Sequence, residues 1–249
     1  MHGPSLNIAA LSDVGRVRKN NEDAFTVCDL ETGARLEAGH GIWSLAVGPR
    51  GCLIALSDGM GGHQAGEIAS ALVVESLIAG LQADATGGTP EDLIAAAVTG
   101  ANADVIRKAE ATGKRGMGAT LTALLFGGTQ AHVAQVGDSR AYVLRRGRLW
   151  QLTRDQSLVQ LLVDQGALTP EDARGSSRKN VLLQAILALG DQRNNGAAPG
   201  LGFLDVPHHL LEGRQEAPCA RRQGQVARGR LPACAAQCHE GLGTGEGFS

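Results

Sequence analysis

The pattern of apolar and polar positions predicts short strands interrupted by two longer helices. Near the N-terminus, strand-like runs at Leu6–Ser12 and Asp23–Asp29 flank a polar turn. A third run, Leu53–Ser57, is expected to stop at the glycine-rich segment that begins with Asp58. The middle of the chain adds further strand signals, at Ala119–Phe126, Ala131–Gly137, Arg140–Leu144 and Leu149–Thr153.

Helical signals fall between the early and the middle strands. Apolar residues from Ile68 to Leu81 lie largely on one face of a helix. The sequence Thr-Pro-Glu-Asp at Thr89 predicts the next helix start, because threonine caps helices and proline fits the first helical position. Shorter helices are predicted over Gln156–Gly166 and from Thr169 onward. Strands and helices do not alternate one by one, so the pattern predicts an α+β fold of antiparallel sheets with outer helices, and not a doubly wound nucleotide-binding fold.

Composition narrows the class of protein. A chain of 249 residues is long enough for one large domain, and a formal net charge of −2 argues against a nucleic-acid binder with a large basic surface. No apolar run of about 18 residues predicts a membrane span, and no secretory leader is visible. Five cysteines in a chain of this size do not make a disulfide framework. Cys28 and Cys52 read as small core residues, and we expect a cytoplasmic protein.

The amino-acid composition changes at about residue 190, after which Arg, Ala, Gly, Pro and Gln dominate. We expect residues 1–189 to form an incomplete domain and residues 190–249 an atypical tail that is poorly ordered or read out of frame. Within the tail Leu201–Val206 still alternates like a strand. Glu212–Ser249 is expected to be poorly folded.

Three acidic and glycine-rich clusters carry the candidate chemistry. Glu22 and Asp23 open a predicted strand, with Arg18 upstream; Asp58 ends another strand before several glycines; and Asp138 lies in a tight bend. Carboxylates without paired cysteines or clustered histidines suit hard cations such as Mg²⁺ or Mn²⁺, and a nearby arginine can clamp a phosphate. Each cluster on its own is also typical of an ordinary turn without any binding function.

Taken together, these segments resemble the bacterial form of the type 2C metal-dependent serine/threonine protein phosphatases. The motifs that carry the resemblance are R-K-N-N-E-D-A at Arg18–Ala24, L-S-D-G-M-G-G-H-Q-A-G-E-I-A-S at Leu56–Ser70, M-G-A-T-L-T-A at Met117–Ala123, V-G-D-S-R-A-Y at Val136–Tyr142 and N-V-L-L-Q-A at Asn180–Ala185. The similarity covers about residues 5 to 189. It implies two antiparallel β-sheets sandwiched between helix layers, a four-layer αββα fold that is incomplete here at its C-terminus.

The resemblance also implies a site for two divalent metal ions, Mn or Mg. Asp58 would bridge the ions, the Gly59 carbonyl would bind one of them, and Glu22 would help hold that ion largely through water. Asp23 would support these ligands, and Asp138 matches a position for a third, weaker ion. The segment Gly116–Thr120 is expected to support the sheet and not to touch substrate.

The implied reaction is hydrolysis of phosphoserine and phosphothreonine by a metal-activated water. Arg18 would bind the phosphate, and His63 is a candidate proton donor, with a structural role as its alternative. Asp155 is followed by Gln156 where the family usually has histidine, so the role of that histidine is not assigned to Gln156. The implied partners are phosphorylated proteins, substrates of a cognate serine/threonine kinase.

Two aspartate motifs that the family carries near its C-terminus, Ser-Asp-Gly and Asp-Asn, do not occur after residue 189. The ion not held by Glu22 and Gly59 would then keep only Asp58 from the protein. Two alternatives to an active phosphatase therefore stay open. One is an inactive phosphatase-like binding or scaffold module, and the other is a truncated or frameshifted product.

Overall fold

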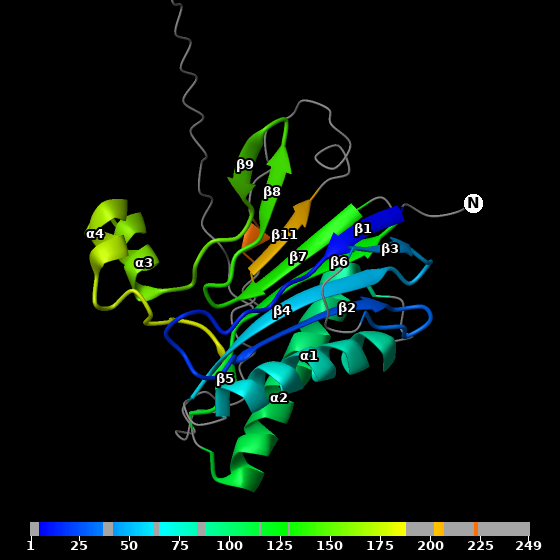
Figure 1. The fold of residues 1–249 in the computed structure, drawn as a ribbon, viewed down its shortest axis with the longest axis horizontal. Coiled ribbons are helices and arrows are strands. Elements are labelled where there is room, and N and C mark those ends of the chain that lie inside the picture. Colours follow the sequence, from blue (N-terminus) through cyan, green and yellow to red (C-terminus); the bar gives the residue numbers. More distant parts are fainter. Residues whose placement is uncertain are drawn as a thin grey trace, which may run out of the picture.

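The computed structural model of the protein describes residues 5–36, 42–61, 65–83, 88–114, 116–128 and 130–187, and the backbone of residues 202–206 and 222–223. Its largest element is an eight-stranded antiparallel sheet with the strand order β10-β5-β4-β6-β7-β11-β12, and with β2 paired to β4 (Figure 1). The strands are β2 (Asp23–Asp29), β4 (Cys52–Met60), β5 (Gly118–Ala119), β6 (Leu121–Gly127), β7 (Gln130–Val136), β10 (Ile186–Leu187), β11 (Gly202–Val206) and β12 (Arg222–Gln223).

Strand β4 is the centre of the sheet and runs further than the sequence predicts. The strand was expected to stop at Asp58, but Gly59 and Met60 continue it because they pair with Ala119 and Gly118 of β5. On its other edge β4 pairs with β2 along the whole length of β2. The end of β4 that carries Asp58 is therefore held between strands on both sides.

Two small two-stranded sheets complete the described β-structure. Strand β1 (Ser5–Ala9) pairs with β3 (Ile42–Ala46), a strand that the sequence pattern did not predict, and β8 (Tyr142–Arg145) pairs with β9 (Arg148–Gln151). Ile8 of β1 packs with Val27 and Cys52 of the main sheet in one buried cluster. Ala141, just before β8, packs on Ala131 and Val133.

Helices α1 (Ala65–Ala83) and α2 (Pro90–Thr112) pack together and cover one face of the main sheet (Figure 1). The main core lies between these helices and the sheet, and includes Leu77 and Ile94, both fully buried. The side chain of Thr89 accepts a hydrogen bond from the Asp92 amide at the start of α2, and Gly113 ends the helix with φ 69°. This confirms the capped start expected from the sequence.

Helix α1 is also long and apolar enough to cross a membrane by length and composition alone, with a mean hydropathy of 1.3. Half of that window is buried inside the protein, which is the ordinary situation of a core helix. The shorter helices α3 (Leu158–Asp164) and α4 (Pro170–Gly175) contact each other. Helices on an antiparallel sheet confirm the predicted α+β class.

Strand β11 pairs with β7, so the main sheet includes a segment beyond residue 189. This agrees with the strand-like alternation at Leu201–Val206. The division into residues 1–189 and 190–249 stays a prediction.

Candidate active site

Three of the predicted acidic residues, Glu22, Asp23 and Asp58, lie where β2 begins and β4 ends. Asp23 lies directly opposite Asp58 in the antiparallel register. The Glu22 carbonyl accepts hydrogen bonds from the Gly59 amide at 3.0 Å and from the Ser70 hydroxyl of α1 at 2.6 Å. The backbone that carries Glu22 and Asp23 is therefore attached to both the sheet and the helix layer.

Gly59 is required for a close contact between β4 and the start of α1. A Cβ atom at this position would lie 2.0 Å from the Gly66 carbonyl oxygen and 2.8 Å from the Glu22 carbonyl oxygen. The family resemblance implies that the Gly59 carbonyl binds an ion; the structure adds that glycine lets the helix dock on the strand. The first turn of α1 is thereby brought next to the acidic cluster.

Thr120, between β5 and β6, connects two of the acidic clusters. Its hydroxyl accepts a hydrogen bond from the Asp58 amide at 3.0 Å and shares a 2.8 Å hydrogen bond with the Ser139 hydroxyl. Its carbonyl accepts from the Ser57 hydroxyl at 2.7 Å. Thr120 thus links the end of β4 to the turn that carries Asp138, the supporting role expected for its segment.

The Asp138 turn is held by two glutamines, Gln135 and Gln156, for which the sequence pattern predicts no role. The Gln156 side-chain oxygen accepts from the Gly137 amide at 2.6 Å, where Gly137 has φ 102°. The buried Gln135 side chain donates to the carbonyls of Gly137 and Ser139, both at 3.1 Å. Gln156 therefore takes a structural function at the position where the family usually has histidine. Only the hydrogen-bond pattern of the folded chain reveals it.

Next to this turn, Arg140 and Asp155 form a bidentate ion pair with N–O distances of 2.8 and 2.5 Å. Burial raises the pKa of Asp138, and the negative charge of Asp155 raises it further, while the turn's own backbone hydrogen bond and Arg140 oppose the shift. Asp138 is thus a half-buried carboxylate in a rigid turn.

The charges of the two other acidic clusters act on Asp58. Partial removal from water raises the pKa of Asp58, and the nearby charge of Asp23 raises it further. Arg18 opposes this shift, whereas Asp138 and Glu22 add to it. A pKa raised by like charges indicates carboxylates that crowd one another, and a bound cation would relieve that repulsion.

Arg18 is the positive member of this group. A guanidinium N–H donates to a carboxylate oxygen of Glu22 at 3.0 Å. The Arg18 side chain is 66% exposed and that of Glu22 only 17%. His63, the candidate proton donor, lies outside the described residues.

The donor set fits a hard divalent cation in its chemistry, because every candidate donor is an oxygen. Within the described ranges, however, no group of three or more His, Cys, Asp or Glu side chains lies close enough together to hold an ion. Water, backbone oxygens or residues outside those ranges would have to complete the coordination.

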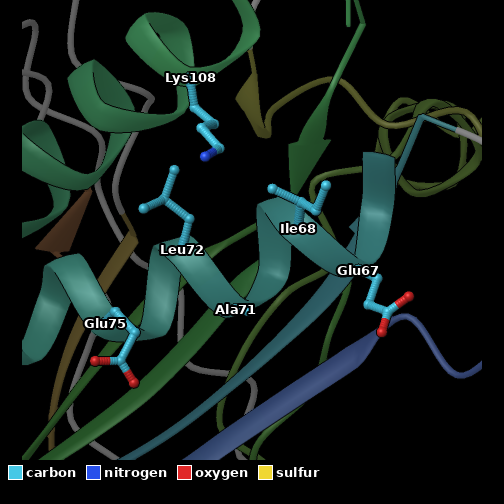
Figure 2. Close-up of a pocket in the computed structure, with 6 residues that line it drawn as sticks. All are labelled: Glu67, Ile68, Ala71, Leu72, Glu75 and Lys108. Carbon is cyan, nitrogen blue, oxygen red and sulfur yellow. The ribbon is translucent and has the colours of Figure 1, made fainter. Parts of the chain in front are cut away.

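A separate surface hollow shares no residue with the acidic cluster. Figure 2 shows its lining from α1 and α2, which consists of Glu67, Ile68, Ala71, Leu72, Glu75 and Lys108.

Comparison with known proteins shows the family to which the chain belongs. A family model described as Protein phosphatase 2C matches residues 40–181, and the chain belongs to that family. The serine/threonine protein phosphatase PstP of Mycobacterium tuberculosis is 41% identical over 182 residues, which make up 73% of this chain and 31% of that protein. The protein phosphatase PhpP of Streptococcus pneumoniae is 34% identical over 183 residues, 73% of this chain and 68% of that protein.

The fold has counterparts among solved structures as well. The catalytic domain of the serine/threonine protein phosphatase PstP, solved in complex with two manganese ions, superposes with a TM-score of 0.54 at 33% identity. The match covers 81% of this chain and 71% of that one. By contrast, this chain spans less than a third of the full M. tuberculosis protein.

Proposed function

We propose that the protein is a divalent-metal-dependent protein phosphatase that hydrolyses phosphoserine and phosphothreonine in other proteins. The observation that carries the proposal is the placement of Asp23 directly opposite Asp58, beside the Arg18–Glu22 ion pair. The charges of Asp23, Arg18, Asp138 and Glu22 all act on Asp58. Membership in the protein phosphatase 2C family supports the same reaction.

The role proposed for each residue is the one that the resemblance of its motif to the family implies. Asp58 and Glu22, with the Gly59 carbonyl, would hold two ions, Mn²⁺ or Mg²⁺; Asp23 would support them, and Asp138 would hold a third. When bound, such ions supply a water of lowered pKa as the nucleophile. Arg18 would bind the phosphate oxygens and neutralise the negative charge that grows on them as the P–O bond breaks. His63 stays a candidate donor to the leaving alkoxide.

The proposed setting is a bacterial-type cytoplasm, where the substrates would be products of a serine/threonine kinase. The described cysteines are unpaired, as a reducing compartment allows. Cys28 and Cys52 are buried free thiols, and burial raises the pKa of Cys52 to about 12. A thiol of that pKa is inert at neutral pH.

A phosphopeptide assay tests the proposal. Phosphate release from a phosphothreonine peptide should require Mn²⁺ or Mg²⁺, stop in excess chelator, and fall at least about tenfold in Asp58→Asn, because that change removes a negative charge that would hold the ions. Glu110→Gln is the matched control, since it removes a carboxylate from the exposed side of α2. If a folded protein bound phosphopeptide without any metal-dependent release, the site would be a binding module and not an enzyme.

A further inference from the structure

The ion pair between Arg18 and Glu22 joins two groups that have different tasks in the proposed reaction. The pair is 3.0 Å long. Arg18 is the residue expected to bind phosphate, whereas Glu22 is expected to help hold a cation. A carboxylate oxygen that accepts an arginine N–H is less available to a cation or to a water bound to that cation, and an arginine paired with a carboxylate is less available to a phosphate.

The two partners differ in how firmly they are held. The Glu22 carbonyl accepts from Gly59 and Ser70, so its backbone is fixed to β4 and α1. Arg18 lies in the segment before β2, outside any helix or strand, with an exposed side chain. The arginine is therefore the partner that can swing away, and Glu22 the one that stays.

We propose that Arg18 is an exchangeable counter-ion of Glu22. When a cation binds Glu22, Arg18 moves from Glu22 to the substrate phosphate, so that anion binding and cation binding are positively coupled. The proposal rests on the proposed function and adds a regulatory contact to it. Phosphate that binds Arg18 frees Glu22 for the cation, and a cation that binds Glu22 frees Arg18 for phosphate. By thermodynamic linkage the two effects are equal in size.

The electrostatics of the site support this exchange. Arg18 also acts on Asp58, where it opposes the repulsion from Asp23, Asp138 and Glu22. A single arginine thus offsets part of the charge that a cation would otherwise neutralise. Removing its positive charge should make the site more attractive to cations, and removing the Glu22 charge should leave Arg18 more available to anions.

The first test measures inorganic phosphate binding in excess chelator, by 31P NMR titration of the full chain. Glu22→Gln should bind phosphate about threefold more tightly than the unchanged protein, the size expected for releasing an exposed ion pair. Asp23→Asn is the matched control: it removes an equal charge from the adjacent residue, for which the described residues show no ion pair with Arg18. Equal gains in both variants would mean a general charge effect and overturn the exchange, as would no gain in Glu22→Gln or no phosphate binding at all.

The second test measures Mn²⁺ affinity by calorimetry, without phosphate. Arg18→Gln should bind Mn²⁺ about threefold more tightly, whereas Arg16→Gln, in the same exposed segment, should not change the affinity. Unchanged or weaker Mn²⁺ binding in Arg18→Gln would overturn the proposal. If no variant turned over phosphopeptide, the proposed function would fail, while these two binding measurements would still decide the exchange.

Discussion

At the level of single residues, the carboxylate of Asp58 lies where desolvation and neighbouring negative charge both act against its ionisation. Its pKa in the folded protein is therefore above that of the unfolded chain. For such a group the stabilising contribution is fully present below the unfolded pKa, near 3.9, and is lost as pH rises through the folded pKa. At neutral pH the ionised Asp58 thus lowers the free energy of unfolding.

It follows that Asp58→Asn should stabilise the protein when no divalent ion is present. We expect a melting temperature about 2 °C higher at about pH 7 in chelator, and little difference near pH 4. Thermal scans at both pH values measure this. A lower melting temperature at neutral pH would show that the Asp58 carboxylate makes stabilising contacts. Added Mn²⁺ should raise the melting temperature of the unchanged protein more than that of the variant.

Arg18→Ala should weaken catalysis more than folding. Loss of a charge-assisted contact to the phosphate costs roughly 2 to 3 kcal/mol of transition-state stabilisation, which is about a 30- to 150-fold lower kcat/KM. The unfolding free energy should change by less than ~1 kcal/mol, because the Arg18–Glu22 pair is largely exposed on the arginine side. Arg16→Ala is the control. A change in kcat/KM of less than about threefold would contradict the role of Arg18 as phosphate ligand.

At the level of elements, docking of α1 on β4 depends on Gly59. Gly59→Ala would put a Cβ atom 2.0 Å from the Gly66 carbonyl oxygen, so helix and strand would have to move apart. We expect a loss of roughly 2 to 4 kcal/mol in the free energy of unfolding, measured by urea titration. Gly100→Ala in α2 is the matched control, since nothing lies within 4 Å of its added Cβ. It should stabilise the protein by about 0.5 to 1 kcal/mol. Equal effects of the two changes would contradict the close contact.

Local signals explain which elements the sequence predicts well. The bounds of β2 agree with the predicted strand, and α2 begins at the predicted cap, because apolar alternation and the Thr89 cap act within a few residues. Strand β3 was missed, since its partner β1 lies far away in the sequence. The continuation of β4 through Gly59 was missed for the same reason, because it depends on pairing with β5.

In the candidate site, too, local sequence signals are predictable and contacts between distant segments are not. Its charged residues stand in recognisable motifs, so the sequence indicates them. The hydrogen bonds of Thr120 to Asp58 and Ser139 join residues that lie far apart along the chain, and no local pattern predicts them. The sequence does not predict the role of Gln156, because its hydrogen-bond donor, the Gly137 amide, is brought beside it only by the fold.

At the level of the whole molecule, the two small sheets, β1 with β3 and β8 with β9, leave large apolar side chains exposed in the described residues. Leu144 and Leu149, which pair across β8 and β9, are 71% and 65% exposed, and Ile42 of β3 is 78% exposed. The sequence after residue 189 also lacks the two aspartate motifs of the family. Both observations predict a marginally stable chain that binds Mn²⁺ weakly, because few ligand charges are available to hold the ion.

A chimera tests this prediction. Residues from 188 onward would be replaced by the corresponding segment of the S. pneumoniae relative. We expect the chimera to melt higher and to bind Mn²⁺ in the micromolar range, against the millimolar range for the chain as it stands. Calorimetric titration of both proteins measures the difference. Micromolar affinity in the unchanged chain would show that its own C-terminal region supplies ligands, and Asp191 and Asp205 would be the first to mutate.

The most direct test of the central claim is phosphate release from a phosphothreonine peptide by the full chain in millimolar Mn²⁺, compared with Asp58→Asn and with excess chelator. We predict slow release that depends on Mn²⁺ and is lost in both comparisons. Release that continues in chelator, or that is unchanged in Asp58→Asn, would contradict a metal-dependent phosphatase centred on Asp58.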